Sequence, residues 1–488
     1  MSNTVVGILG LITIAAIVVT LFKSKTQPAI AFIVFPIILA IVLIIGGRYS
    51  LEDLAKMIKA GFGSTGPTAA LFVFSVLYFG IMTDAGMFDV IIGKLMKFVG
   101  DNVIGVCMMT AVIALIGHLD GGGASTFCIV VPAMLPVYKR MHMRKTTLLR
   151  IAVLAMGVLN LMPWAGPTMR AATVLGMDAS ELWKGSLIII QIFGVVLALV
   201  HAFLAGLQEK KRGAGLTGKL AREEGEVAIE DGEQVAANTS DLARPKLFWF
   251  NILLTVGVIF LLIWSDGFDL PSYVPFMLGT AIALFVNYGF TAKMHKKIIN
   301  LHAGPALMMC STLMGAAVLM GILTSSMGTT FTVKIEDGIQ VAKETWGVLP
   351  VKLQELPEGA VPSVVRCLGN IVADILPSFL GQNLPLVIGI LSVPLALAFD
   401  TDSYFYGMLP IMMAIGQSFG VEPLPIAIAM VVCRNCATFI SPMVPATLLG
   451  TGLADVDIKD HIKASFMYVW VFSILCMLFA VIIGKLPL

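Results

Sequence analysis

Long apolar runs, separated by short polar stretches, make up most of the chain. Runs at 5–22, 30–47, 187–205 and 464–483 approach or reach the ~20 apolar residues that an α-helix needs to cross a bilayer. The pattern therefore predicts an all-α polytopic membrane protein, with about ten transmembrane helices plus two re-entrant hairpins.

The composition agrees with this pattern. Of 488 residues, 58% are hydrophobic and 13% are charged, whereas soluble domains carry roughly a quarter charged residues. An ordinary soluble globule is thus excluded, and we expect a multi-pass protein of the cell (inner) membrane, with the lipid bilayer as its main partner. The net charge of +2 does not point to a nucleic-acid partner, and none is expected.

The motifs of common enzymes and metal sites do not occur. Cys433 and Cys436 form a CxxC, but no second CxxC or His pair accompanies it, so packing in a helix is the favoured interpretation. There is no phosphate-binding glycine loop, zinc motif or nucleophile triad. We expect no enzyme activity, no resident metal and no cofactor. The first apolar run lacks a basic leader and a cleavage site, which indicates a retained span.

Basic residues between the runs indicate the topology, because cytoplasmic loops carry an excess of Lys and Arg. Clusters at 23–25, 139–150, 210–212 and 293–297 can all face the cytoplasm under one arrangement. In that arrangement, 103–118 and 127–138 are the two arms of a re-entrant hairpin, and both termini lie outside.

The two halves of the chain repeat the same polar interruptions. Asp120 and Asp400 each open a polar tip, 280 residues apart, and Pro163 and Pro442 each lie in a later break, 279 residues apart. Inverted repeats with interrupted helices point to a secondary transporter. We expect an N-terminal span at 1–26, a first repeat at 27–207 (hairpin 103–138, broken helix 147–177), a cytoplasmic linker at 208–246, a connecting span at 247–271 and a second repeat at 272–488 (insertion 329–366, hairpin 384–418, broken helix 422–452).

The first tip has the residues of an anion site. Gly121, Gly122 and Gly123 let the chain turn with its N–H groups exposed. Ser125 and Thr126 then open a helix, where N–H groups and the dipole attract an anion. The alternative is a capped loop on the membrane surface, against which the repeat and the apolar flanks argue.

Acidic residues mark both tips. Asp120 opens the first, and Asp400 and Asp402 lie in the second beside Thr401 and Ser403. Acids at this depth are costly unless they bind a cation, take up a proton or pair with a base. All three are candidates for proton coupling or for facing a divalent metal through oxygen, with a structural helix cap as the alternative for any one of them.

Each broken helix contains prolines, which remove donors and clash with the preceding turn. In the first, Asn160, Pro167 and Thr168 flank the break and Arg170 follows. A guanidinium holds carboxylates in a bidentate fork, although a structural ion pair with an intramembrane Asp is a competing interpretation. The second break has no such arginine, but Arg434 lies one to two turns earlier. Its candidate substrate-binding residues are Asn435, Ser441 and Thr447.

Together these segments resemble the citrate–metal–proton symporter family (CitMHS) of the ion-transporter superfamily. The resemblance lies in 78–86, the tip at 120, 163–172, 401–407, and 441–447 with 455–461. It implies proton-coupled symport of citrate, often as a complex with Mg²⁺ or Ca²⁺, an elevator mechanism and a homodimer. It also implies a site built from Asp120–Thr126, Pro163–Arg170, Asp400–Ser403 and Ser441–Thr447. The insertion and the single acid of the first tip depart from the family pattern.

Two other function classes compete with this interpretation. A sodium- or proton-coupled carrier of free di- or tricarboxylate, without metal, fits the same scaffold, and transport that ignores divalent metals would indicate it. A membrane enzyme or a channel is the other class. An enzyme should show a His- or Cys-rich cluster, and a channel needs a continuous polar-lined span, whereas the polar groups here concentrate in four breaks.

Overall fold

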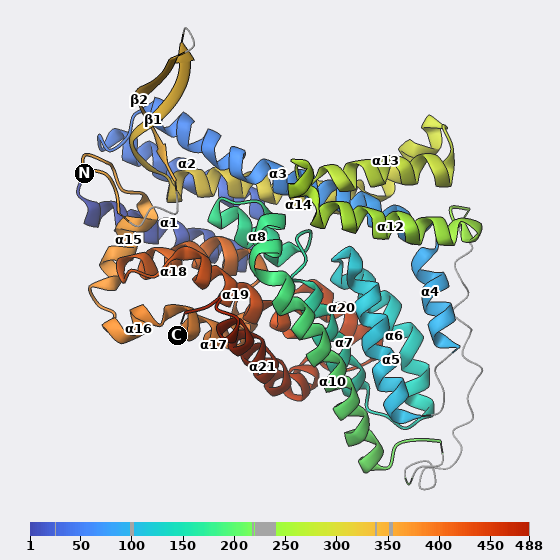
Figure 1. Cartoon of the computed structure of the whole chain (residues 1–488). Helices are drawn as coiled ribbons and strands as arrows, with labels where there is room; N and C mark the ends of the chain where they lie inside the picture. The colour runs from blue at the N-terminus through green and yellow to red at the C-terminus, as the bar shows by residue number, and fades with distance from the viewer. Residues whose placement is uncertain are drawn as a thin grey trace.

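The computed structural model describes residues 1–24, 26–97, 102–216, 219, 241–336, 339–350 and 355–487. Most of the predicted linker at 208–246 and part of the predicted insertion lie outside these residues. Helices dominate (Figure 1). The helices before residue 213 are α1 (Asn3–Ser24), α2 (Pro28–Ile45), α3 (Leu51–Asp84), α4 (Met87–Met96), α5 (Val103–Gly117), η1 (His118–Asp120), α6 (Gly123–Arg140), α7 (Lys145–Leu159), α8 (Gly166–Leu175), α9 (Ala179–Leu182), η2 (Trp183–Leu187) and α10 (Ile188–Arg212). Those after residue 244 are η3 (Pro245–Leu247), α12 (Phe248–Ile263), η4 (Ser265–Phe268), α13 (Val274–Tyr288), α14 (Ala292–Thr324), α15 (Val364–Ala373), α16 (Ser378–Gln382), α17 (Leu384–Ala398), η5 (Ser403–Met408), α18 (Leu409–Ser418), α19 (Pro423–Ala437), η6 (Thr438–Ile440), α20 (Pro445–Ala454) and α21 (Ile458–Ile482).

Nine helical segments of the described chain are long and apolar enough to cross a membrane. Two of them, α3 and α14, have 34 and 33 residues, well beyond the ~20 that a span requires. Three shorter apolar helices, α13, α15 and α17, accompany them. The prediction of an all-α polytopic membrane protein is confirmed, whereas the re-entrant hairpins and the inverted repeats stay predictions.

Helices α2, α3, α12, α13 and α14 form one layer of the molecule (Figure 1). Within it, α3 and α14 cross with their backbones close together. A Cβ atom at Gly61 would overlap the carbonyl oxygen of Ala317, and one at Gly321 would overlap that of Met57. Small residues at such crossings allow the close approach that stabilises helix pairs in lipid. We call these five helices the scaffold layer.

A second contact joins α3 and α14 away from this crossing. The ring of His302 packs over Gly80, where a Cβ would overlap it. Its Nε2 lies 2.9 Å from the Asp84 Oδ2 atom at the end of α3. The two helices are therefore held together by backbone proximity at one place and by a polar contact at another.

Interrupted helices lie beside the scaffold layer, in the group α5–α8, α10 and α17–α21 (Figure 1). Here α7 ends at Leu159 and α8 begins at Gly166, while α19 ends at Ala437 and α20 begins at Pro445. Each second half begins after a residue with extended backbone and has a proline in its first turn, as expected where a helix restarts. The breaks fall within 147–177 and 422–452.

The predicted insertion contains the only strands of the described chain, β1 (Ser326–Glu336) and β2 (Ile339–Leu349). They pair antiparallel, from Ser326 opposite Leu349 to Glu336 opposite Ile339, and project from the end of the scaffold layer (Figure 1). Trp346 anchors β2 to the first turn of α3, because its Nε1 donates to the Asp53 Oδ1 atom at 3.0 Å and its carbonyl accepts from Lys56 Nζ at 3.1 Å.

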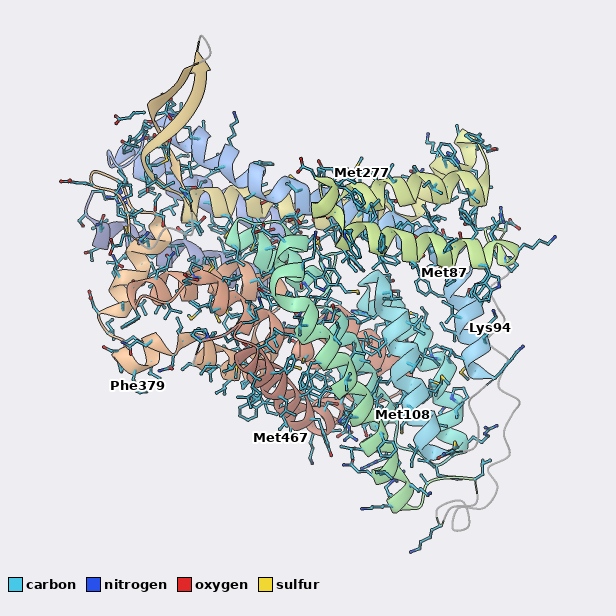
Figure 2. All side chains as sticks on the ribbon, in the orientation of Figure 1. Met87, Lys94, Met108, Met277, Phe379 and Met467 are labelled. Carbon is cyan, nitrogen blue, oxygen red and sulfur yellow. The ribbon has the colours of Figure 1, made fainter. Side chains whose placement is uncertain are left out.

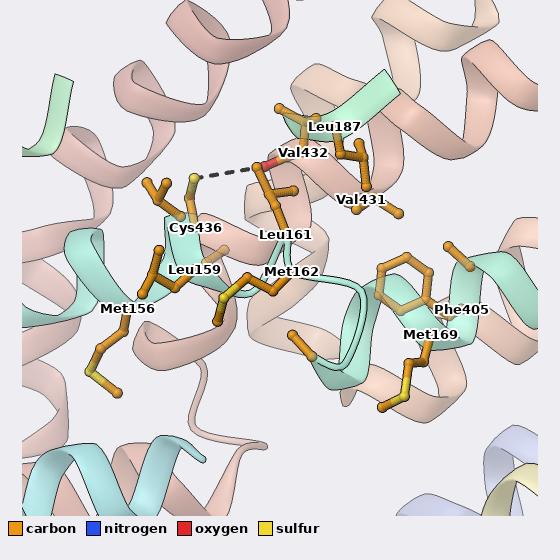
Figure 3. Packing of buried hydrophobic residues seen from close by; sticks show 14 of the residues in the cluster. Met156, Leu159, Leu161, Met162, Met169, Leu187, Phe405, Val431, Val432 and Cys436 are labelled. Atoms are coloured by element: carbon orange, nitrogen blue, oxygen red, sulfur yellow. Dashed lines mark hydrogen bonds between the residues drawn. The ribbon is translucent and has the colours of Figure 1, made fainter. Parts of the chain in front are cut away.

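Apolar side chains enclose the first break. Figure 3 shows Leu161 and Met162 of the break beside Val431 on α19. In the same cluster the Cys436 thiol donates to the Val432 carbonyl at 3.7 Å. Cys436 is therefore a buried packing residue, and any polar group in this region is surrounded by a dry core.

The outer surface of the helices is apolar as well. Met277 on α13 and Met467 on α21 point away from the molecule (Figure 2) and are 38% and 57% exposed. They belong to a long series of large apolar side chains exposed on the helices, as expected where lipid is the surrounding solvent.

Candidate functional site

The first tip, Asp120–Thr126, is a turn closed by its own carboxylate. Gly121 has φ +71°, a left-handed conformation that glycine adopts without steric cost. Asp120 accepts hydrogen bonds from the Gly122 N–H at 2.7 Å and from the Ser125 hydroxyl at 2.5 Å. Among the described residues, no cationic side chain lies within ion-pair distance of Asp120. Neutral donors alone hold this carboxylate.

A histidine connects the first tip to the first break. His118 Nδ1 lies 2.8 Å from the Thr126 hydroxyl, and its Nε2 lies 3.1 Å from the Asn160 Oδ1 atom. His118 is fully buried. Both ring nitrogens are thus used to join two polar interruptions that are about 40 residues apart in the chain, a separation bridged by the antiparallel packing of α5, α6 and α7.

The first tip also contacts the second break. Trp164, in the first break, donates from Nε1 to the Leu119 carbonyl at 2.8 Å. On the other side, the Phe439 ring of the second break lies so close to Gly123 that a Cβ atom there would overlap it. The third glycine of the tip is therefore required for packing between the two halves of the chain.

Arg170 on α8 reaches the second tip. Its Nε atom lies 2.6 Å from the Asp402 Oδ1 atom, and the Arg170 side chain is 8% exposed. Its Nη2 atom lies 3.6 Å from the Met309 sulfur on α14. The structural ion pair that competed with substrate binding for Arg170 is present, and it joins the first break to the second tip across 232 residues.

Asp400 caps the helix that leaves the second tip. Its carboxylate accepts from the backbone N–H groups of Asp402 at 3.1 Å and Ser403 at 3.3 Å. Thr401, which follows Asp400 in the chain, is half-buried, and Ser403 is fully buried. The structural cap, the alternative considered for the tip acids, is thus observed at Asp400.

Arg434 lies fully buried at the end of α19. It donates to the Phe399 carbonyl at 3.2 Å and to the Thr438 hydroxyl at 3.3 Å, and its Cζ atom lies 5.6 Å from the centre of the Tyr404 ring. No carboxylate of the described residues lies within ion-pair distance of it. A buried cation without an anionic partner is costly, so this guanidinium is suited to hold a carboxylate from a ligand.

Three further polar atoms at the breaks have no hydrogen-bond partner in the protein. They are both side-chain polar atoms of Asn435 and the Nδ2 atom of Asn160. The Arg434 Nε atom is in the same condition. Buried polar groups are nearly always paired, and leaving one unpaired costs about 1–3 kcal/mol. These unpartnered atoms are concentrated at the two breaks.

Each break contains the same kind of contact, from a threonine hydroxyl to a backbone carbonyl. Thr168 donates from its hydroxyl to the Asn160 carbonyl at 2.9 Å, and Thr447 donates to the Thr438 carbonyl at 3.4 Å. In both cases a threonine of the second half-helix satisfies a carbonyl freed by the break. The remaining predicted residues lie beside them: Pro167 in the first turn of α8, and Ser441, whose hydroxyl accepts from the Met443 N–H at 3.2 Å.

A cavity of about 280 Å³ separates α8 from the scaffold layer. It includes Thr173, three residues after Arg170, and extends to the end of β2. Its lining also includes Gly61, Gly321, Thr324 and Pro350. The cavity therefore offers an approach to α8 from the side of the β-hairpin.

Sequence reasoning did not select every residue that the structure brings together. Arg434 was considered only as a substitute for an arginine in the second break, although a charge inside an apolar run is itself a signal. The Phe439 ring gave no signal. In the described part of the chain, no group of three or more His, Cys, Asp or Glu side chains is arranged to hold a metal ion.

Comparison with known proteins places the chain in a family. The family model described as "Citrate transporter" (CitMHS) matches residues 2–344. A citrate transporter of Bacillus subtilis is 31% identical over 478 residues, which cover 98% of this chain and 99% of the relative. The chain belongs to the citrate transporter family. It is therefore a membrane transporter and not an enzyme.

Two other relatives match this chain over nearly its full length. The Mg(2+)/citrate complex secondary transporter of Bacillus subtilis is 30% identical over 482 residues, and the uncharacterized transporter YraO of the same organism is 28% identical over 485. Each match covers 99% of both chains. The solved structure of the Alcanivorax borkumensis YdaH transporter superposes with a TM-score of 0.53 at 13% identity, over 94% of this chain and 98% of that one, which shows a shared fold.

Proposed function

We propose that this protein carries citrate across the membrane by symport with protons, as a complex with a divalent metal such as Mg²⁺ or Ca²⁺. One observation carries the proposal: two buried guanidiniums, Arg170 and Arg434, lie beside the helix breaks, and only Arg170 contacts a carboxylate. The Arg434 guanidinium, which has no carboxylate partner, and the unpartnered amide atoms of Asn160 and Asn435 are matched to a substrate with several carboxylates. The names of the citrate-transporting relatives support the same substrate.

The charges of the site explain why cations should accompany the substrate. The tips carry three carboxylates, Asp120, Asp400 and Asp402, against the two guanidiniums of Arg170 and Arg434. The site alone thus has an excess of one negative charge when every acid is ionised. A tricarboxylate would add to this excess in a buried place, where uncompensated charge is strongly unfavourable. Protons or a divalent metal would neutralise it.

Asp120 is the acid best placed to carry the proton. Asp402 is paired with Arg170, and Asp400 caps a helix through two backbone N–H groups. Asp120, in contrast, is held by neutral donors without a cation, so its charge has the least compensation. It would be protonated when substrate is loaded and deprotonated when substrate is released.

The metal would travel as part of the cargo. Since the described residues contain no cluster of three ligating side chains, citrate itself would supply most of the oxygen ligands that Mg²⁺ or Ca²⁺ requires. A tip carboxylate would face the complex. In an elevator mechanism, the group with the broken helices would move against the scaffold layer, and two copies of the chain would form a homodimer around the scaffold.

Uptake of labelled citrate into proteoliposomes tests this proposal. Proton and sodium gradients are imposed separately, each with and without Mg²⁺. We expect uptake to follow the proton gradient and to rise with Mg²⁺. Uptake that follows sodium and ignores Mg²⁺ would instead establish the second candidate, a carrier of free di- or tricarboxylate, which the same pair of guanidiniums also fits. Absence of citrate uptake under all four conditions would reject both.

A further inference from the structure

An apolar groove of about 350 Å³ runs between α10 and α21, two helices that lie side by side in Figure 1. Its rims carry exposed apolar side chains, such as Val200 at 47% and Val471 at 50%. Met467 on the α21 rim points outward (Figure 2). Because both helices are membrane spans, hydrocarbon chains are the natural contents of this groove.

A buried arginine lies beside one end of the groove, in contact with two of its lining residues. Arg150 is 5% exposed, and its Cζ atom lies 3.9 Å from the centre of the Tyr468 ring. Its Nη2 atom is 3.4 Å from the Gln208 side-chain oxygen, and its Nε atom is buried without a partner. Tyr468 and Gln208 both line the groove. The guanidinium therefore lies directly behind the groove wall.

No anion in the described chain neutralises this arginine. Glu209, the acid next to Gln208, is taken by Arg144 at 2.6 Å and Arg212 at 3.0 Å. His201, which lines the groove, also has a buried Nε2 atom without a partner. A buried cation without an anionic partner is costly, and so is a buried nitrogen without a hydrogen-bond partner. An anionic ligand in the groove would satisfy both groups.

Two exposed lysines lie at the mouth of the same end. Lys211 follows Gln208 by three residues on α10, and Lys463 precedes Met467 by four on α21, so helix periodicity places both on the groove-facing stripes. Within the residues that the structure describes, neither forms an ion pair. This membrane face is also the one where the basic clusters at 139–150 and 210–212 lie, which is typical of the cytoplasmic side.

We propose that this groove binds an anionic phospholipid, with one acyl chain between α10 and α21 and its phosphate near Arg150 and His201. Anionic lipids are concentrated in the cytoplasmic leaflet, and basic pockets between spans on that side bind their headgroups. The proposal is independent of the citrate site, which lies at the breaks. It adds a lipid partner that would link transport to the composition of the membrane.

Native mass spectrometry of the purified full chain tests the proposal. The probes are phosphatidylglycerol, phosphatidylcholine with the same acyl chains, and glycerol 3-phosphate without chains. We expect phosphatidylglycerol to bind tighter than phosphatidylcholine, and each cation removed near the phosphate to weaken it about fivefold. Glycerol 3-phosphate should not bind measurably, because it cannot fill the groove. Equal binding of the two lipids, equally tight binding of glycerol 3-phosphate, or occupation by a second copy of the chain would overturn the proposal.

Variants locate the bound lipid. Arg150→Met and the double variant Lys211→Gln/Lys463→Gln should both lose the preference for phosphatidylglycerol. The double variant changes exposed residues only, so it tests the proposal even where Arg150→Met does not fold. The matched control, Lys139→Gln/Lys293→Gln, removes two exposed lysines away from the groove and should keep the preference. A control that loses it to the same extent would show non-specific attraction and would also overturn the assignment.

Discussion

The crossing of α3 and α14 and the cluster of broken helices show two opposite ways to build the interior of a membrane protein. At the crossing, side chains are removed: Gly61 and Gly321 bring carbonyl groups and helix backbones together. At the breaks, polar groups are brought in: Arg170, Arg434 and Asn435 are buried at or beside helix ends. The close crossing has no side chains that could bind a substrate. The breaks contain polar atoms that form no hydrogen bond within the protein.

The difference shows where such a fold can contain buried polar groups without hydrogen-bond partners. Continuous helices satisfy their own backbone, so their contact needs only close packing. The breaks free backbone and side-chain groups inside the protein. Two kinds of variant test this view: those that remove polar groups from the breaks, and those that add volume at the α3–α14 crossing.

The largest effect is expected for Arg170→Ala. Loss of a buried, hydrogen-bonded charge that holds a ligand carboxylate costs about 2–5 kcal/mol of binding free energy, which corresponds to at least about thirtyfold in affinity. We expect citrate uptake to fall by at least that factor. Proteoliposome uptake measures the loss, and Lys145→Gln, which removes an exposed cation paired with Asp455 at 2.8 Å, is the control with normal uptake.

A double variant separates substrate binding by Arg170 from a purely structural ion pair. In Arg170→Met/Asp402→Leu both charges are absent, and an apolar pair of similar volume is often as stable as the buried ion pair. Thermal stability should therefore recover while uptake stays lost. Recovery of uptake together with stability would show that Arg170 serves only to pair with Asp402.

The next effect concerns coupling at Asp120. Asp120→Asn keeps one oxygen that can accept from Gly122 or Ser125 but cannot release a proton. We expect residual citrate uptake that no longer responds to an imposed proton gradient. Asp455→Asn, at an exposed carboxylate outside the breaks, is the matched control and should respond like the natural protein. A full proton response of Asp120→Asn would remove Asp120 from the coupling mechanism.

The scaffold should respond to volume and not to polarity. Leu at position 61 would overlap the α14 backbone, whereas Gly63, two residues later on α3, has open space around it. Overpacking costs about 1–3 kcal/mol, or more where the backbone must move. We therefore expect Gly61→Leu to lower the thermal unfolding temperature and Gly63→Leu to leave it unchanged. Equal effects of the two would contradict the close crossing.

The smallest effect is expected at Asn435. Its amide has no partner in the protein, so Asn435→Ala removes only what it contributes to the ligand. A hydrogen bond contributes about 0.5–1.5 kcal/mol, and we expect citrate affinity to fall about two- to tenfold without loss of stability. Asn383→Ala, which removes an exposed amide bonded to the Phe379 carbonyl, should leave affinity unchanged.

Several features of the site could be predicted from local sequence. The apolar runs predicted the spans, because the bilayer imposes their length. Pro163 and Pro442 marked the breaks, since proline cannot continue the helix, and the glycines at 121–123 marked the tip. These signals are local, and local rules were sufficient for them.

Contacts between distant residues could not be predicted in the same way. The pairing of Arg170 with Asp402 joins residues 232 positions apart, and only the packing of α8 on the second tip decides it. The β-hairpin had a usable signal, the stretch rich in β-branched residues from Thr329 to Ile335, but the sequence analysis identified this segment only as an insertion. That Arg434 has no carboxylate partner among the described residues depends on the tertiary fold, because the fold determines which acidic side chains lie near it.

A density map of the protein in lipid nanodiscs, with saturating citrate and Mg²⁺ and compared with a map without citrate, tests the central claim most directly. We predict that added density appears between the two breaks, in contact with Arg170, Arg434 and Asn435. Density that appears only elsewhere, for example in the cavity between α8 and the scaffold layer, would contradict the assignment of the breaks as the binding site.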